Sequence, residues 1–319
     1  PGFHKHLSTK ELLKEIPPLK SQNLLGGFKY FDASMWDDGL TVETLRAAHG
    51  LGVAVANYVE AIVPIWKDEG ISGFRVRDLE ADPSQAVIEI RAKKVVICVG
   101  PWTDVLGERI NPSWTPWLSP SKGVHLVFDL KRIPLPGALV MSHPQDGRIS
   151  FVIPRPDLGS GIVIVGTTDG PSPKNPEVTL IENSDVDYLM SLLNSYFPEL
   201  ALTEEDILSA YVGVRPLMGD MKGSEGQKSQ KGPLQKVSRE HFIGDGPGGT
   251  VIVAGGKYTT HRKMAEEIVD FSLKSWKKEA LKGKRSPIPL HITGSTTRTP
   301  LNLKAVSYTH LTLPTNREV

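Results

Sequence analysis

One stretch of the sequence, residues 251–262, has residue types and spacing that could hold a negatively charged group. Four apolar residues open it, which is typical of a buried parallel strand. Gly255 and Gly256 follow, so the backbone can bend sharply and approach a ligand closely. Thr259 and Thr260 then offer N-caps for a helix, whose N–H groups and dipole favour an anion. Such a corner is not specific by itself, because most glycine turns between a strand and a helix are structural.

Two side chains elsewhere in the chain are suited to chemistry on a polar compound. His125 is a candidate base, because imidazole has an ordinary pKa of about 6.5. Arg215 carries a guanidinium that can donate two parallel hydrogen bonds to a phosphate, and Pro216 stiffens the turn behind it. The residues alone leave alternatives open. A strand histidine is more often a core residue, and an arginine can equally belong to a surface ion pair.

Length and composition exclude several classes of protein. The 319 residues, 39% of them hydrophobic, can form two domains or one large α/β unit. The net charge of +1 gives no reason to expect a nucleic-acid partner. The single cysteine, Cys98, rules out an internal disulfide framework and fits a reducing compartment. No apolar run reaches the ~18–20 residues that a membrane-spanning helix needs. Cys98, His143, His241, His261 and His291 lack the spacing of metal ligands, so we expect no metal.

Alternating helix and strand patterns must position the candidate residues. Ser8 and Glu11 form a capping box, and Ser184 with Asp187 forms a looser one. Residues 37–39 are predicted to form a turn. Helices are predicted over residues 9–16, 40–49, 103–109, 184–197 and 260–276. Strands are predicted over residues 28–31, 53–59, 61–67, 70–77, 86–91, 95–99, 123–128, 138–141, 148–153, 161–165, 209–215, 251–254 and, as a short pair, within 234–243.

The strand patterns differ in a way that separates two regions. Short turns join the strands of residues 61–91, which favours an antiparallel meander. Residues 95–99 form a continuous apolar run, as expected of a buried parallel strand. The four strands of residues 123–165 are expected to form one mixed or antiparallel sheet. Residues 111–121 are rich in Pro and Trp and suggest a domain crossing, while residues 219–232 are polar and glycine-rich, typical of a mobile loop.

Six motifs occur in an order that resembles a known family. They are Val99-Gly100-Pro101-Trp102, Ser121-Lys122-Gly123-Val124-His125, Phe151-Val152-Ile153-Pro154, Gly166-Thr167-Thr168-Asp169, Gly213-Val214-Arg215-Pro216-Leu217 and residues 255–262. On these residues the sequence resembles FAD-dependent glycerol-3-phosphate dehydrogenases, within the D-amino-acid-oxidase-like flavoprotein group. The likeness extends from Ser8 to Trp276.

The resemblance implies an α/β fold in which a Rossmann-like FAD-binding domain is interleaved with a substrate domain on a mixed β-sheet. It assigns residues 1–35 and 110–232 to the substrate domain, and residues 36–109 and 233–282 to the FAD domain. Residues 283–306 would begin a truncated C-terminal domain. We interpret residues 307–319 as a non-native tail and exclude them from the fold.

The resemblance also assigns roles to single residues. His125, Arg215 and Lys257 are the expected catalytic residues, and together with Arg262 they are expected to bind the substrate. Six residues are expected to bind FAD, namely Gly100, Trp102, Gly255, Gly256, Thr259 and Thr260. Trp102 can equally be a core residue, and residues 166–169 can equally form a turn with an Asx-type hydrogen bond.

The function implied by the resemblance is oxidation of glycerol 3-phosphate to dihydroxyacetone phosphate, with hydride transfer to FAD N5 and a quinone as acceptor. A cytoplasmic location follows, with peripheral contact at the inner membrane face and a homodimer both kept open. The alternatives are an oxygen-dependent glycerol-3-phosphate oxidase, a relative that acts on an amino or hydroxy acid, and an inert fragment. The inert fragment is considered because the family begins with a strand and a Gly-x-Gly-x-x-Gly turn for the FAD pyrophosphate, which we do not find. We therefore expect a chain truncated at both ends.

Overall fold

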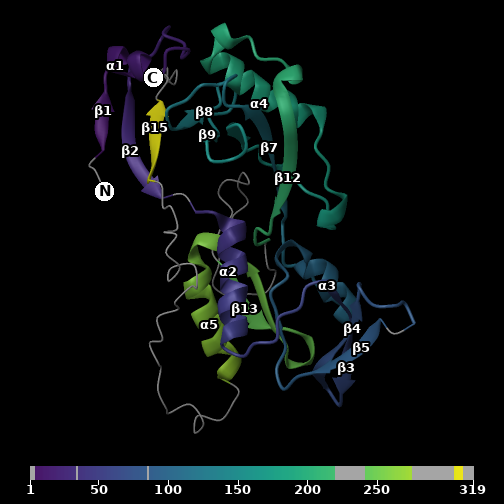
Figure 1. Ribbon diagram of the computed structural model, residues 1–319. Coiled ribbons are helices and arrows are strands. Elements are labelled where there is room, and N and C mark those ends of the chain that lie inside the picture. Colours follow the sequence, from purple (N-terminus) through teal and green to yellow (C-terminus); the bar gives the residue numbers. More distant parts are fainter. Residues whose placement is uncertain (1–3, 34, 85, 220–240, 275–304, 312–319) are drawn as a thin grey trace, which may run out of the picture.

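The computed structural model describes residues 4–33, 35–84, 86–219, 241–274 and 305–311. They form two bodies, one above the other in Figure 1. The upper body, here called the large-sheet body, contains the start of the chain and residues 118–219. The lower one, here called the small-sheet body, contains residues 37–117 and 241–274. The chain thus passes between the two bodies several times.

The large-sheet body is built on a nine-stranded sheet in the order β1-β2-β15-β8-β9-β10-β7-β11, with β12 paired to β7. The pairs are antiparallel except β15 with β8, so the sheet is mixed, as predicted. The strands are β1 (Lys5–Leu7), β2 (Gly27–Ala33), β7 (Ser121–Asp129), β8 (Ala138–Ser142), β9 (Ile149–Arg155), β10 (Ile162–Gly166), β11 (Gly170–Pro171), β12 (Ile207–Arg215) and β15 (Ala305–Leu311).

Strand β15 differs from the expectation for the end of the chain. Residues 307–319 were excluded from the fold, but residues 305–311 form a strand between β2 and β8 (Figure 1). The β-branched and aromatic residues at 306, 308 and 309 suit such a strand.

The core of the large-sheet body lies between one face of the sheet and helix α4 (Asn183–Tyr196). On β7, Val124, Leu126 and Phe128 are fully buried, because alternate residues of a strand share a face. They pack with Leu189 and Leu193 of α4. Helix α1 (Thr9–Glu15) adds its apolar side to the same core and begins at the predicted capping box of Ser8 and Glu11. The opposite face of β7 carries His125 and does not contribute to this core.

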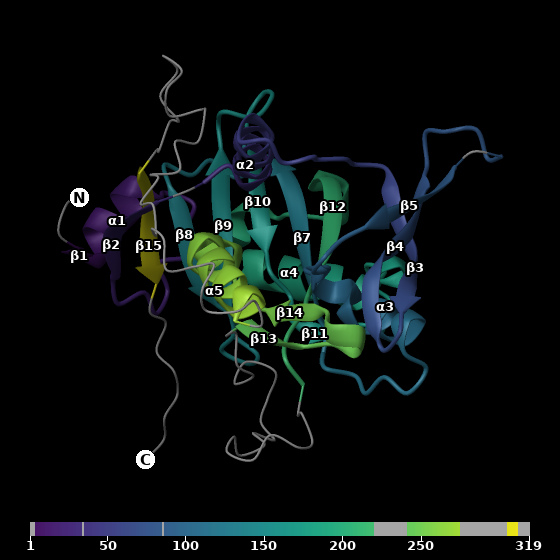
Figure 2. The ribbon, with the colours of Figure 1, turned by 90° about the horizontal axis from the view of Figure 1, so that it is seen from below.

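The small-sheet body contains two three-stranded sheets. In one, β14 (Val251–Gly255) lies between β13 (His241–Asp245), antiparallel to it, and β6 (Val96–Ile97), parallel to it. The other is the predicted antiparallel meander of β3 (Val59–Lys67), β4 (Gly70–Asp78) and β5 (Val87–Arg91). The helices are α2 (Asp37–Gly50), α3 (Thr103–Ile110) and α5 (His261–Leu273). In Figure 2, α5 lies beside β13 and β14, and α3 lies beside the meander.

Several predicted elements are confirmed. β6 and β14 pair in parallel, as predicted, and β14 is buried. The predicted strand over residues 95–99 is reduced to Val96–Ile97, and Val96 is 41% exposed, so its buried character is not confirmed. The four strands of residues 123–165 form one antiparallel stretch of the large sheet. The α/β class and the presence of several sheets are therefore as expected.

Other predictions are wrong in ways that have physical reasons. Residues 37–39 form the first turn of α2 rather than a free turn, because acidic residues favour a helix N-terminus. Residues 53–58 are exposed and form no strand despite their apolar pattern. Helix α4 is capped by Glu182 with Asp185, not by Ser184 with Asp187.

Most of the predicted loop at residues 219–232, and residues 234–240, lie outside the described residues.

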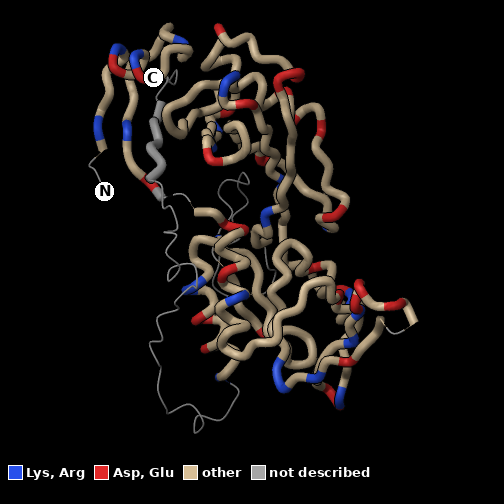
Figure 3. The backbone as a smooth tube through the Cα atoms, viewed as in Figure 1, with Lys and Arg blue, Asp and Glu red and all other residues tan. Residues whose placement is uncertain are grey.

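Charge is distributed over both bodies. Figure 3 shows Lys and Arg interspersed with Asp and Glu along the described backbone, in keeping with the net charge of +1. Among the described residues, no helix has the length and apolar character needed to cross a membrane.

Candidate active site

The open face of the large sheet carries a row of side chains from four neighbouring strands. Phe151 of β9, Gly166 of β10, His125 of β7 and Tyr211 of β12 are directly opposite one another in register. Residues in register point to the same face of a sheet. Phe151 and Tyr211 are 37% and 46% exposed, so this face is accessible at both sides of His125.

His125 is half-buried and its environment favours the neutral imidazole. Burial, and then the charge of Arg215, lower the pKa of His125 from 6.5 to about 4. Its Nδ1 atom is buried and has no hydrogen-bond partner in the part of the chain that the structure describes. A neutral imidazole has one nitrogen lone pair that can accept a proton, so His125 is chemically competent as a base near neutrality.

Arg215 lies at the end of β12, beside His125. Its Nη1 donates to the Lys122 carbonyl at 3.1 Å and to Asp169 Oδ1 at 3.4 Å. Its Nη2 donates to Thr167 Oγ1 at 2.9 Å and to the Thr168 carbonyl at 3.3 Å. The side chain is 28% exposed, so the guanidinium is anchored from one side and accessible from the other.

A glycine makes this arrangement possible. A Cβ atom at Gly123 would lie 2.3 Å from Arg215 Nη2 and 2.5 Å from Thr167 Oγ1. Gly213 is opposite Gly123 in register, and a Cβ there would have nothing within 4 Å. The guanidinium therefore occupies the space that the missing side chain of Gly123 leaves.

A polar network supports Arg215 from behind. Asp169, which pairs with Arg215, accepts a short hydrogen bond from Ser121 Oγ. Arg148 Nη1 donates to the Asp169 carbonyl at 2.5 Å. Asp169 thus ties β7, β12 and the residues before β9 together around the guanidinium.

Lys122 anchors the same strand on the opposite side. Its buried ammonium lies 2.8 Å from Asp185 and 3.0 Å from Glu182, at the start of α4. Burial acts to lower the pKa of Lys122, but the hydrogen bonds to these carboxylates outweigh it, so the pKa is raised. Lys122 is therefore a structural cation that fixes the beginning of β7.

The second group of predicted residues lies at one edge of the small-sheet body. The parallel strands β6 and β14 run toward the same edge, and glycines follow them at Gly100 and at Gly255-Gly256. Gly255 and Gly256 have φ of 72° and 87°, a region that favours glycine. A Cβ at Gly100 would have nothing within 4 Å. Gly100, Gly255 and Gly256 are only partly exposed, and a Cβ at Gly256 would lie 2.5 Å from Met264 Cε, so α5 covers part of the glycine backbone at this edge.

The start of α5 differs in detail from the prediction. Residues Tyr258–Thr260 form a 3-10 turn, and α5 begins at His261. Thr260 is the N-cap residue, but its hydroxyl donates to the Lys257 carbonyl at 2.9 Å and makes no capping bond. Thr260 therefore occupies the predicted N-cap position without making a capping hydrogen bond, and Thr259 is not the N-cap. Lys257, Thr259 and Arg262 are exposed, so their side chains are available to a ligand.

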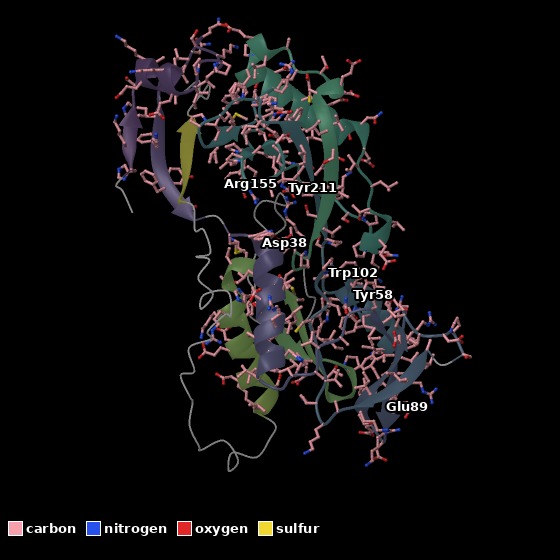
Figure 4. All side chains as sticks on the ribbon, in the orientation of Figure 1. Asp38, Tyr58, Glu89, Trp102, Arg155 and Tyr211 are labelled. Carbon is pink, nitrogen blue, oxygen red and sulfur yellow. The ribbon has the colours of Figure 1, made fainter. Side chains whose placement is uncertain are left out.

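One turn of the second group reaches the large-sheet body at the junction of the two bodies. The turn Gly100–Trp102 contacts both β14 and the strand β12 that carries Arg215. Trp102 is 42% exposed and its Nε1 donates to Glu177 at 3.3 Å, so it is not a core residue. In Figure 4, Tyr211 and Arg155 lie at the lower margin of the large-sheet body, and Asp38 lies below them at the start of α2.

These residues fit one part of FAD better than another. The partly exposed glycine backbone and the start of α5 suit the flat, electron-accepting ring, because N–H groups stabilise negative charge there. Gly244, Gly246 and Gly249 have the spacing Gly-x-Gly-x-x-Gly, but they join the antiparallel strands β13 and β14. No helix follows them, so this turn lacks the strand–turn–helix geometry that binds a pyrophosphate. Among the described residues we find no other turn of that spacing.

Sequence reasoning missed the neighbours that shape the site. Tyr211 and Asp169 received no role, although Tyr211 lies four residues before Arg215 and so shares its face of the strand. This four-residue spacing could have placed Tyr211 beside Arg215 from the sequence alone.

Within the described ranges, no three His, Cys, Asp or Glu side chains lie close enough to hold a metal ion.

Comparison with known proteins gives the site a context. A family model described as FAD dependent oxidoreductase matches residues 1–262. The aerobic glycerol-3-phosphate dehydrogenase of Staphylococcus saprophyticus is 35% identical over 274 residues, which cover 86% of this chain and 46% of that protein. The chain thus spans about half the length of the curated relatives it matches.

Solved structures agree with that context. The glycerol-3-phosphate dehydrogenase of Bacillus halodurans, complexed with FAD, aligns with a TM-score of 0.71 and 33% identity, over 84% of this chain and 49% of that one. The L-alpha-glycerophosphate oxidase of Mycoplasma pneumoniae, with FAD bound, aligns with a TM-score of 0.60 and 18% identity, over 86% of this chain and 65% of that one. The second likeness concerns the fold alone. Since the family model covers most of the sequence, the chain belongs to the FAD-dependent oxidoreductase family.

Proposed function

We propose that the protein containing this chain oxidises glycerol 3-phosphate to dihydroxyacetone phosphate with FAD. The observation that supports this most strongly is the pairing of a neutral, half-buried His125 with a half-exposed Arg215 on one open face. The two proteins named above that share 33–35% identity with this chain are glycerol-3-phosphate dehydrogenases. We also propose that the large-sheet body is the substrate domain and the small-sheet body the FAD domain. Ile110, Trp114 and Trp117 pack in the core of the small-sheet body, which supports a boundary after residue 117 rather than at residue 110, where it was expected from the sequence.

His125 removes the hydroxyl proton of the substrate in this proposal. A base must be deprotonated before the reaction, and a pKa of about 4 keeps the imidazole neutral at pH 7. Burial and Arg215 disfavour the imidazolium, so His125 is a weaker proton acceptor than an ordinary histidine and readily passes the proton on to solvent.

Arg215 holds the substrate phosphate in this proposal. Two of the hydrogen bonds described above, to Asp169 and the Thr168 carbonyl, are 3.4 and 3.3 Å long and thus weak. A phosphate can take over these two donors while the shorter bonds to Thr167 and Lys122 keep the guanidinium in place. Lys257 and Arg262, both exposed at the other body, add positive charge for the same phosphate.

Gly100, Trp102, Gly255, Gly256, Thr259 and Thr260 hold the flavin ring in this proposal. The cofactor, when bound, accepts a hydride from the substrate carbon. The contribution of the chain is to present backbone N–H groups and the positive end of α5 to the ring edge that gains charge. The pyrophosphate must be held by residues other than those described.

We propose a quinone as electron acceptor, because the relatives at about 35% identity are named dehydrogenases. A quinone is lipid-soluble, so peripheral contact with a membrane belongs to the same proposal. Anaerobic reoxidation of the reduced flavin by a water-soluble quinone, set against reoxidation by oxygen, measures the preference. Faster reoxidation by oxygen would make the protein an oxidase.

The proposed function is tested on the purified chain. FAD is added, unbound flavin is removed by gel filtration, and the visible spectrum is recorded. Glycerol 3-phosphate is then added without oxygen, with glycerol and glycine as controls. We expect bound flavin to be bleached by glycerol 3-phosphate alone. Bleaching by glycine would indicate an amine oxidase, and a chain that retains no flavin would be the inert fragment.

A further inference from the structure

The orientation of the His125 ring is not set in the usual way. A catalytic histidine is commonly oriented by a hydrogen bond to the ring nitrogen that does not react. Here Nδ1 is buried, and within the described residues no donor or acceptor reaches it. Packing must therefore fix the ring plane.

Two neighbours in register provide that packing. On the β10 side, a Cβ at Gly166 would lie 2.2 Å from His125 Cδ2, so the imidazole lies over the space above this glycine. On the β12 side, the ring of Tyr211 stacks on the imidazole, with centroids 4.8 Å apart and planes 11° apart. The imidazole is thus confined between Gly166 on one side and the Tyr211 ring on the other.

We propose that Tyr211 is a positioning residue that fixes the plane of the His125 imidazole and shields it from water. This deepens the proposed function and rests on it for the role of His125. Aromatic stacking of this kind contributes about 0.5–1.5 kcal/mol beyond burial, enough to favour one ring orientation over others. An off-plane base loses much of its rate, because proton transfer requires a well-aligned lone pair.

The charged groups around the pair are consistent with this role. Arg215 faces His125 from the same strand as Tyr211, and Asp169 pairs with Arg215. Burial, with the negative charge of Asp37 at the start of α2, raises the pKa of Tyr211, while Arg155 opposes the shift. Tyr211 therefore remains a neutral phenol near pH 7 and acts through its ring.

The test is an NMR titration of His125 in the full chain, which requires neither FAD nor substrate. Tyr211→Val removes the ring but suits a strand, whereas Tyr211→Phe and Tyr211→Trp keep an aromatic face. We expect Tyr211→Val to raise the pKa of His125 by about one unit, since water reaches the imidazole. The two aromatic variants should leave it near the wild-type value. Tyr211→Met replaces the valine variant if the latter does not stay folded by circular dichroism.

The matched control is Tyr188→Val. Tyr188 stacks on His143 with centroids 3.8 Å apart, so the same change removes a similar contact elsewhere on the large-sheet body. It should leave the pKa of His125 unchanged. The proposal is overturned if folded Tyr211→Val leaves the His125 pKa within about 0.2 of wild type, or if Tyr188→Val shifts it equally.

A kinetic readout separates this inference from the proposed function. In FAD-loaded protein, Tyr211→Val should lower kcat about tenfold with little change in KM, because the phosphate contacts remain. Restoration of kcat by Tyr211→Trp supports positioning. If wild-type protein shows no activity, the proposed function fails, while the titration still decides whether Tyr211 shields His125.

Discussion

The open face of the large sheet and the glycine edge of the small-sheet body are built in different ways. On the sheet face, stacking holds His125, and hydrogen bonds to the Lys122 and Thr168 carbonyls, Thr167 and the Asp169 carboxylate hold Arg215. At the glycine edge, Lys257 and Arg262 are exposed, and the ordered features are backbone features. The first region thus fixes side chains and the second offers main-chain N–H groups.

This difference matches the roles proposed for the two regions, with substrate chemistry on the sheet face and flavin binding at the glycine edge. Preorganised side chains lower a reaction barrier because they need not rearrange when the reaction occurs. Main-chain N–H groups do not depend on the side chain, so they suit a cofactor that itself supplies the reactive group. Substitutions on the sheet face should therefore change rate and stability strongly, whereas those at the glycine edge should act mainly through the ligand.

The largest expected effect follows removal of His125, the proposed base. His125→Asn keeps a polar side chain but cannot take the proton, so the rate of anaerobic flavin reduction should fall about 10²- to 10⁴-fold. Stopped-flow spectroscopy of FAD-loaded protein measures it. The control is His49→Asn, at an exposed position near the end of α2. An undiminished rate in His125→Asn would remove it as the base.

The next effect is on the pH dependence of folding. Because the folded-state pKa of His125 is about 4 and the ordinary value is 6.5, the unfolded chain binds a proton first as pH falls. The stability linked to His125 is present above pH 6.5 and lost as pH falls toward 4, by at most about 3 kcal/mol. Urea unfolding of wild type and His125→Asn at several pH values isolates it. Parallel curves would contradict the buried neutral state.

A smaller effect is expected from filling the space beside Arg215. Gly123→Ala should lower the free energy of unfolding by about 1–3 kcal/mol, because the new methyl group collides with the guanidinium and Thr167. It should also weaken binding of glycerol 3-phosphate. Gly213→Ala, directly across the strand pair, meets nothing within 4 Å and is the matched control. Equal losses in both variants would mean that the space has no special role.

The smallest effect concerns the glycine edge. Tyr258 and Thr41 share a hydrogen bond of 2.8 Å between their hydroxyls, which links the turn before α5 to α2. Because both are exposed, Tyr258→Phe should cost only about 0.5–1 kcal/mol in thermal unfolding. A loss larger than that of Gly123→Ala would reverse the contrast between the two regions.

Local patterns predicted much of the fold. The capping box at Ser8, the meander of β3 to β5 and the parallel pairing of β6 with β14 all depend on residues near one another in sequence. The start of α2 was missed because acidic residues beside a glycine suit both a turn and a helix N-terminus. Residues 53–58 were misassigned because an apolar pattern does not say whether a partner strand is present.

The sequence identified candidate residues of the site but not how they pack against one another. Motif positions drew attention to His125 and Arg215, and the structure brings them to one face of one sheet. The contact of Tyr211 with His125 depends on the register of β12 against β7, which no local pattern specifies. The packing of the Arg215 guanidinium against Gly123 likewise depends on a contact between residues far apart in the sequence.

The most direct test of the account is an NMR titration of the chain with glycerol 3-phosphate at constant pH, observing the His125 imidazole and the Arg215 guanidinium. We predict that both signals shift together and saturate, that glycerol shifts neither, and that His49 stays unchanged. Shifts confined to exposed residues, with His125 and Arg215 unaffected at saturating ligand, would contradict the claim that this sheet face binds the substrate.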